Sequence, residues 1–169
     1  ETRYSALPDY SLKADEWEFY PASENLEPFP GLELRMKWYE KCAPALSVDA
    51  VQKCIDQKID KDEITHLITV SCTGMSAPGL DLQVMEMMDL PANIFRTSVN
   101  FMGCYAAIHG MKLADAFCKS DKNAKVLVVC TELCTLHFQR ETTEDNVASG
   151  LLFGDGAAAI LVVHDDDRL

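Results

Sequence analysis

The chain has 169 residues, of which 48% are apolar and 25% charged, as in a soluble globular protein with one core. Its formal net charge of −12, without a cluster of lysine and arginine, argues against nucleic acid as a partner. No apolar run approaches the roughly 20 residues that cross a bilayer, and no basic-then-apolar leader is found, so we expect a cytoplasmic protein that does not bind membranes.

The first 30 residues are polar and aromatic and contain four of the seven prolines, so we expect residues 1–30 to form an irregular arm. A domain covering 31–169 follows. Its helical spacing begins near Leu32, and Pro44 is expected to kink or split this first helix. Ser47 is a suitable N-cap for the helix that continues after the proline.

Strands and helices then alternate along the chain. An apolar run without polar alternation, as at 126–129, is typical of a strand buried on both faces. The predicted strands cover 66–71, 94–99, 126–129 and 157–163, and the predicted helices cover 78–88 and 105–117. Strands separated by helices favour right-handed crossovers, so we predict an α/β fold with a mostly parallel, mixed sheet and helices on both faces.

Cys104 stands where a predicted strand gives way to a predicted helix. Gly103 permits a tight turn there, and the unpaired N–H groups at a helix N-terminus stabilise a thiolate. Other enzymes present a nucleophile at such an elbow, with backbone N–H groups at hand for an oxyanion. The helix behind Cys104 is so apolar that we expect it to be buried nearly all round. From the residues alone, Cys104 is either a nucleophile or one more buried cysteine.

A nucleophilic cysteine needs a base, and the four histidines offer no convincing one. His109 lies about 140° around the helix from Cys104, at 100° per residue, so it faces away. His66 begins a strand, and His164 closes one. His137 follows a strand end and could reach a cleft, but nothing in the sequence fixes it as the base.

The odd count of seven cysteines, most of them in apolar segments, is typical of reduced thiols in a cytosolic protein. Cys72 and Cys134 fall at strand ends, where α/β sheets place their sites. Cys130, Cys134 and His137 have a spacing faintly like that of metal ligands. A zinc site usually has a fourth ligand and a closer cysteine pair, so structural zinc is not favoured.

A sharp turn is predicted around Asp155, which stands between Gly154 and Gly156 and leads into a strand of small residues. We expect the Asp155 carboxylate to bond local backbone N–H groups. Phe153, just before the turn, belongs either to the core or to the wall of a cavity.

Taken together, these segments resemble the thiolase-like condensing enzymes, and most closely the type III polyketide synthases of the chalcone/stilbene synthase group. The resemblance runs in family order over about residues 60–163. It rests on Ile64-Thr-His-Leu-Ile68, Cys72-Thr-Gly74 with Ala77-Pro-Gly79, Gly103-Cys-Tyr-Ala-Ala107, Lys125-Val-Leu-Val-Val-Cys-Thr-Glu132 and Phe153-Gly-Asp-Gly-Ala-Ala158. Any one motif is weak, but the ordered set is specific.

The resemblance implies that Cys104 takes a starter acyl group from coenzyme A and that Phe153 is the gatekeeper between an access tunnel and the cavity. It also implies five substrate-binding residues near or along that cavity: Cys72, Thr73, Glu132, Cys134 and His137. Plant members carry hydroxyl residues at three of these positions, 72, 134 and 137. Ala77 replaces a methionine that in plant enzymes reaches into the partner subunit's cavity, and two residues fewer separate Cys130 from Phe153.

The implied reaction is a decarboxylative Claisen condensation, in which malonyl-CoA extends an acyl group that acyl-CoA has delivered to Cys104. The resemblance implies no metal or redox cofactor, and it implies a homodimer. In this family a histidine and an asparagine from a second half assist the cysteine, so we expect a nucleophile-bearing N-terminal half that is inactive alone. Two alternatives stay open: a ketoacyl-ACP synthase III-like enzyme of fatty-acid synthesis, and a non-catalytic dimerisation domain of the same fold.

Overall fold

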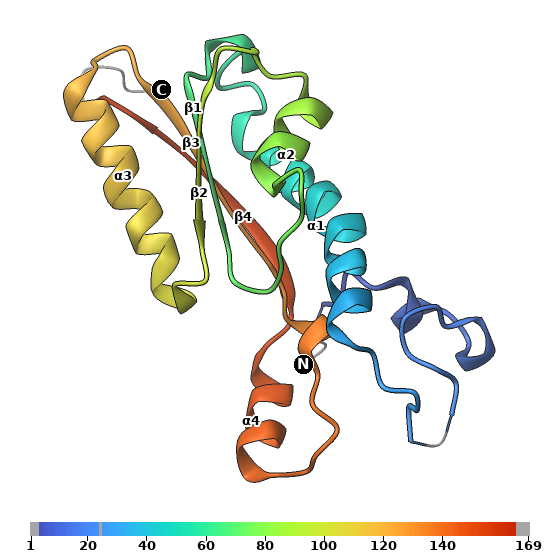
Figure 1. Cartoon of the computed structure of the whole chain (residues 1–169). Coiled ribbons are helices and arrows are strands. Elements are labelled where there is room, and N and C mark those ends of the chain that lie inside the picture. Colours follow the sequence, from blue (N-terminus) through green and yellow to red (C-terminus); the bar gives the residue numbers. More distant parts are fainter. Residues whose placement is uncertain (1–3, 24, 165–169) are drawn as a thin grey trace.

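The computed structural model describes residues 4–23 and 25–164. These residues form a sheet with the strand order β2-β1-β3-β4 (Figure 1). β1 (His66–Ser71), β2 (Phe95–Asn100) and β3 (Lys125–Leu133) run parallel, and β4 (Asp155–Val163) is antiparallel to β3. The predicted α/β class with a mostly parallel, mixed sheet is confirmed. β3 is longer than predicted, because β4 pairs with it along all nine residues.

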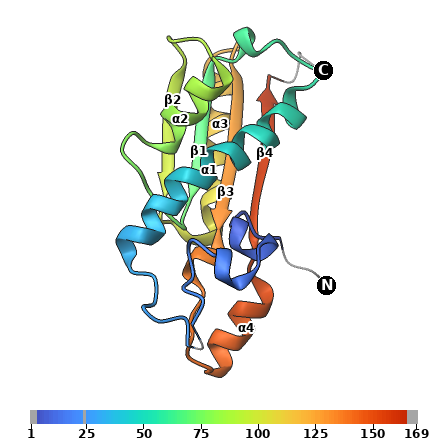
Figure 2. The same cartoon turned by 90° about the vertical axis from the view of Figure 1, so that its right-hand side faces the viewer.

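Helices lie on both faces of the sheet, as predicted. α1 (Leu32–Ile55) and α2 (Leu80–Met88) cover one face, and α3 (Ala106–Ser120) covers the other (Figures 1 and 2). α4 (Glu144–Leu152) is not among the predicted elements, and it projects beyond the end of the sheet. Within the described ranges, no helix combines the length and apolarity that a membrane span requires.

Two apolar layers hold the sheet between its helices. Leu67 and Leu127 pack into the layer under α1 and α2, which also contains Val51. Their neighbours Ile68 and Val128 point to the opposite face, because side chains alternate along a strand, and they pack under α3. Burial of each such side chain contributes about 1.5–3 kcal/mol. The central strands are therefore apolar on both sides, as the unbroken apolar run at 126–129 predicts.

α1 is one helix, so of the kink or split predicted at Pro44 the split is wrong. Pro44 lies inside α1 and is buried, and the helix continues to Ile55. The proline removes one backbone donor, but the buried face of α1 packs on the sheet and outweighs that loss. Ser47 is not an N-cap either, because its Oγ donates to the Ala43 carbonyl and forms a 2.6 Å hydrogen bond with Oγ1 of Thr131 in β3.

α3 is buried only on the side that faces the sheet. The prediction that this helix is buried on nearly all sides is therefore wrong for this chain. The buried residues recur every four positions: Ala106, Gly110, Ala114 and Cys118. Gly110 allows a close approach to the sheet, since a Cβ there would lie 3.1 Å from the Val70 side chain and 3.2 Å from that of Val128. The outward side leaves Ile108 and Met111 partly exposed.

The N-terminal arm is irregular but packs against the core. The carboxylate of Asp9 is buried and accepts hydrogen bonds of 2.8–2.9 Å from the backbone N–H groups of Glu18, Phe19 and Tyr20. These bonds close the arm into a loop, which places Leu7 and Phe19 in the layer under α1. Short 3₁₀ turns occur in the arm at Pro8–Ser11 and Ala14–Glu16, and a third precedes β1 at Lys61–Glu63.

Candidate active site

Cys104 lies at the junction between β2 and α3. β2 ends at Asn100, a 3₁₀ turn occupies Gly103–Tyr105, and α3 starts directly after it. Phe101 and Gly103 have positive φ values of 56° and 67°, so the chain turns sharply before the thiol. A left-handed backbone costs a residue with a Cβ about 1–2 kcal/mol, which glycine avoids. The tight turn predicted at Gly103 is present.

A cavity of about 500 Å³ opens beside Cys104. Its walls come from the ends of β1 and β3, from the start of β4 and from Ala107 in α3. The carboxyl ends of parallel strands open at the same edge of a sheet, which is where α/β folds bind ligands. The cavity contains six of the seven candidate site residues: Cys72, Thr73, Cys104, Glu132, Cys134 and Phe153.

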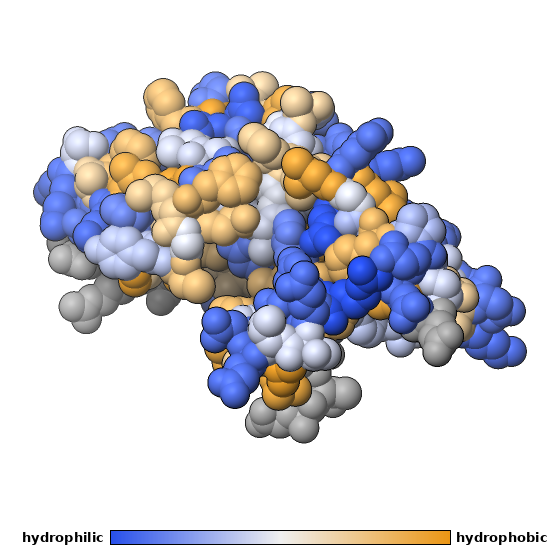
Figure 3. Space-filling view, turned by 60° about the horizontal axis from the view of Figure 1, so that its bottom comes forward, coloured by the Kyte–Doolittle hydropathy of each residue, from blue (hydrophilic) through white to orange (hydrophobic). Residues whose placement is uncertain are grey.

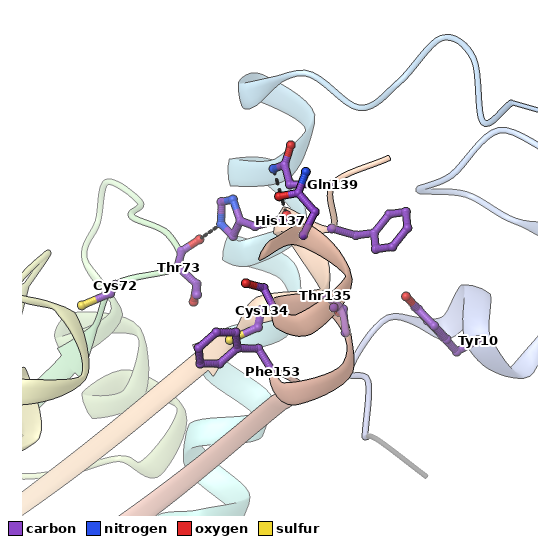
Figure 4. Close-up of a pocket in the computed structure, with 12 residues that line it drawn as sticks. Tyr10, Cys72, Thr73, Cys134, Thr135, His137, Gln139 and Phe153 are labelled. Carbon is purple, nitrogen blue, oxygen red and sulfur yellow. Dashed lines mark hydrogen bonds between the residues drawn. The ribbon is translucent and has the colours of Figure 1, made fainter. Parts of the chain in front are cut away.

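A second cavity of about 340 Å³ adjoins the first. Figure 4 shows the residues that line this second cavity. The two cavities share four wall residues: Cys72, Thr73, Cys134 and Phe153. Phe153 is 45% exposed, and because it lines both cavities its ring lies at the boundary between them. His137, the seventh candidate, lines the second cavity only.

Glu132 holds the turn after β1 in place. Its carboxylate accepts hydrogen bonds from the backbone N–H of Cys72 at 2.9 and 3.1 Å and from that of Thr73 at 3.0 Å. Thr73 Oγ1 donates a further bond of 2.7 Å to the carboxylate and accepts one from the N–H of Leu133. The Glu132 carboxylate therefore positions two cavity residues, Cys72 and Thr73, and its negative charge is compensated by their hydrogen bonds.

His137 is likewise bonded to this turn. Its Nε2 lies 2.6 Å from the Thr73 carbonyl oxygen, and because a carbonyl only accepts, Nε2 carries the proton (Figure 4). His109 packs edge-on against the ring of Tyr105, with 4.7 Å between the ring centroids. Among residues 4–23 and 25–164, no histidine forms a hydrogen bond with the Cys104 thiol.

Cysteines in the cavity differ in accessibility. All seven cysteines lie in described residues, and Cys104 is the one that is exposed. Burial, reinforced by the nearby carboxylates of Glu132 and Asp155, raises the pKa of Cys134 to about 11. Burial and Glu132 also raise the pKa of Cys130. Both groups are therefore thiols near neutral pH, which disfavours them as nucleophiles.

Comparison with known proteins identifies the family. The family described as "Chalcone and stilbene synthases, N-terminal domain" matches residues 18–166, nearly the whole chain. The chain belongs to the chalcone and stilbene synthase family. The predicted resemblance to type III polyketide synthases is thus confirmed.

Two matches to this chalcone synthase-like chain come from Dictyostelium. "Probable polyketide synthase 1" of Dictyostelium discoideum is 32% identical over 125 residues, which make up 73% of this chain and 4% of that protein. The crystal structure of the C-terminal type III polyketide synthase domain of Steely1, a type I/III hybrid, superposes with a TM-score of 0.75 at 27% identity. The match covers 88% of this chain and 43% of that one, so the chain spans less than half of either relative. The thiolase-like fold is confirmed.

In this family member Asp155 is the first residue of β4, and its carboxylate bonds no local backbone N–H groups, contrary to prediction. Oδ1 accepts from the backbone N–H of Thr135, and Oδ2 accepts from Thr135 Oγ1 at 2.6 Å. Oδ2 also accepts from the backbone N–H of Ala6 at 2.7 Å and from Ser5 Oγ at 3.2 Å. Asp155 therefore ties the N-terminal arm to the end of β3, next to the second cavity.

Seven wall residues of the second cavity are not predicted from the sequence: Tyr10, Thr135, Phe138, Gln139, Asn146, Ser149 and Gly150. Those from 146 to 150 belong to α4, for which a signal does exist. Thr143 precedes Glu144 and Asp145, and its side chain accepts from the N–H of Asn146, as an N-cap does. Nothing in the sequence links Tyr10 to the cavity. Within the described residues, no three His, Cys, Asp or Glu side chains are grouped so as to hold a metal ion.

Proposed function

We propose that Cys104 is the nucleophile of a type III polyketide synthase reaction. Its thiolate attacks the carbonyl of an acyl-CoA thioester, coenzyme A leaves as the thiolate, and the acyl group stays on Cys104. Decarboxylation of malonyl-CoA then yields a carbanion that attacks the acyl carbonyl and lengthens the chain by two carbons. The observation that carries this proposal is the exposure of the Cys104 thiol, at the start of α3, into a cavity formed by the strand ends.

The start of α3 supports the first step. The first N–H groups of a helix have no partner within the helix, and their positive potential favours a thiolate and an oxyanion nearby. The two neighbouring cavities support the second step, since a growing chain needs room beyond the thiol. We assign Phe153 to the boundary between the space where substrate enters and the space where the chain extends, because its ring lines both cavities.

A homodimer is part of the proposal. The end of the molecule that carries Cys104 exposes apolar side chains around a hollow (Figure 3). Phe101, Met102 and Tyr105 are each about half exposed there, and Ile108 and Met111 continue the apolar surface along α3. A surface of this composition favours association with a further protein surface of similar character.

Acyl-enzyme formation tests the function. The full-length protein is incubated with acyl-CoA thioesters of several chain lengths, and the intact mass and the modified peptide are measured. We expect an acyl adduct on Cys104 that disappears in Cys104→Ala and persists in Cys54→Ala, a matched change on α1 away from the cavity. An adduct that survives Cys104→Ala contradicts the assignment. Acylation from acyl carrier protein thioesters alone would favour the ketoacyl synthase alternative, and no acylation from either donor would favour the non-catalytic one.

A further inference from the structure

Four of the seven cysteines line one cavity: Cys72, Cys104, Cys130 and Cys134. Acyl transfer uses one thiol, so the function proposed above leaves the other three unexplained. Free cysteines are more often scattered in cores than gathered around a solvent-open space. Their grouping places an accessible thiol beside thiols that can react with it.

Cys72 is held against the backbone that carries Cys104. The Cys72 thiol donates a 3.5 Å hydrogen bond to the carbonyl oxygen of Gly103, the residue before Cys104. In a trans peptide that oxygen lies about 2.8 Å from the next Cα, so the Cys72 sulfur is at most about 6.3 Å from the Cα of Cys104. The Cys104 sulfur lies about 2.8 Å from its own Cα, so turning that side chain toward Cys72 brings the two sulfurs to within about 3.5 Å. A further rotation of the Cys72 side chain would close the remaining gap to the bonding distance of about 2 Å.

The other two cavity thiols are poorer partners. The raised pKa values of Cys130 and Cys134 keep both in the unreactive thiol form near neutral pH. Glu132 also favours Cys72 over these two, because its carboxylate fixes the backbone N–H of Cys72 and so holds this residue next to the Cys104 turn.

We propose that Cys72 and Cys104 form a reversible disulfide when the protein meets hydrogen peroxide. The Cys104 thiolate attacks one peroxide oxygen, the O–O bond breaks, hydroxide leaves, and the sulfur becomes a sulfenic acid. The Cys72 sulfur then attacks the Cys104 sulfur, the S–O bond breaks, and the hydroxyl group leaves with the Cys72 proton as water. Two external thiols reduce the disulfide again. The consequence for activity rests on the proposed function, since a disulfide-bonded Cys104 cannot accept an acyl group.

This pairing gives Cys104 a protected oxidised form. Without a second thiol, a sulfenic acid is oxidised further to a sulfinic acid, which ordinary thiols do not reduce. With Cys72 at hand, the sulfenic acid is consumed before that step. An acyl group on Cys104 would block the first step, so substrate should protect against both products.

Peptide mapping tests the disulfide in the full-length protein. Trypsin cleaves after lysine and arginine, so Cys72, Cys104 and Cys134 fall in three separate peptides, 62–96, 97–112 and 126–140. After treatment with peroxide and alkylation of the remaining thiols, we expect peptides 62–96 and 97–112 to be joined, and dithiothreitol to separate them. Cys72→Ser should abolish the joined species and raise sulfinic acid at Cys104 roughly threefold or more, whereas Cys134→Ser should change neither.

Two outcomes overturn the inference. One is sulfinic acid forming at Cys104 equally fast with and without Cys72, and the other is peptide 97–112 joined to 126–140 instead. Acylation of Cys104 is measured separately on the reduced protein. If the reduced protein is not acylated but peroxide still produces the disulfide, the proposed function alone is refuted. If the reduced protein is acylated but peroxide produces no disulfide, this inference alone is refuted.

Discussion

Glu132→Gln tests whether the turn after β1 depends on a carboxylate. Glutamine has nearly the same shape but replaces one acceptor oxygen by an NH₂ group. The Glu132 carboxylate accepts bonds from the N–H of Cys72 and from the N–H and Oγ1 of Thr73. If the amide oxygen takes the place of Oε2, it keeps the bonds to Thr73 and the longer, 3.1 Å bond from the N–H of Cys72. The NH₂ group then replaces the oxygen that accepted the shorter, 2.9 Å bond, so two donors face each other there.

The size of the effect follows from these contacts. Glu132 is half-buried, so water replaces the lost acceptor only in part. A hydrogen bond to a charged group is worth about 1.5–3 kcal/mol, and the bonds kept by a neutral amide are weaker, so we expect a loss of about 2–3 kcal/mol. For a chain of this length, 1 kcal/mol lowers Tm by about 2–4 °C, so the expected fall in Tm is about 4–12 °C.

Thermal unfolding and urea denaturation measure this loss. Glu141→Gln is the matched control, because it makes the same chemical change at an exposed position after β3. A Tm for Glu132→Gln within about 1 °C of the control would refute the reasoning. Such a result would mean that the turn holds its shape without the carboxylate.

Three further outcomes are expected. Iodoacetamide at pH 8 should label the exposed Cys104 well before Cys134, because the Cys134 pKa of about 11 leaves only about one molecule in a thousand as the thiolate. Labelling of Cys134 should rise only as the pH approaches 11, and equal labelling of the two cysteines at pH 8 would contradict this prediction. Asp155→Asn leaves one neutral acceptor oxygen for donors of Ser5, Ala6 and Thr135 that now share two charged ones, so trypsin should cut the arm after Lys13 several-fold faster. An unchanged rate would mean that other contacts hold the arm. The 169-residue chain by itself should not condense malonyl-CoA, since no described histidine is bonded to Cys104; product formation in a radiolabel assay would refute this.

Local patterns predicted those parts of the fold that local physics decides. The apolar run at 126–129 predicts a strand buried on both faces, and that strand lies in the middle of the sheet. Gly103 predicts a turn, and its φ of 67° is one that glycine adopts without strain. The seven candidate site residues came mainly from the family resemblance rather than from local patterns, and all of them line the two cavities, because strand ends carry most of them to the same edge of the sheet.

Errors arose where a side chain has its partner far along the chain. Ser47 fits an N-cap by its neighbours, but it is bonded to Thr131, which is 84 residues away. Asp155 fits a local turn, but it is bonded to Ala6 and Thr135. Sequence spacing carries no information about such pairs, since they form only after the sheet has brought its strands together.

Residues of the arm were missed for the same reason. Tyr10 reaches the second cavity because the arm folds back over the end of β3, where Tyr20 Oη donates to the Thr135 carbonyl. No periodicity in residues 1–30 predicts that contact. Pro44 does not split α1, and the reason is a different one: the energy of packing a whole helix face on the sheet exceeds the loss of one hydrogen bond.

The bond between Ala6 and Asp155 has a consequence for biosynthesis. The ribosome adds about 5–20 residues per second, so the arm emerges roughly 7–30 s before the carboxylate that will anchor it. During that interval Leu7 and Phe19, which are both buried in the folded protein, lack the anchor that holds the arm on the sheet. The apolar side chains of the arm are therefore open to chaperones and to neighbouring chains until that carboxylate has emerged.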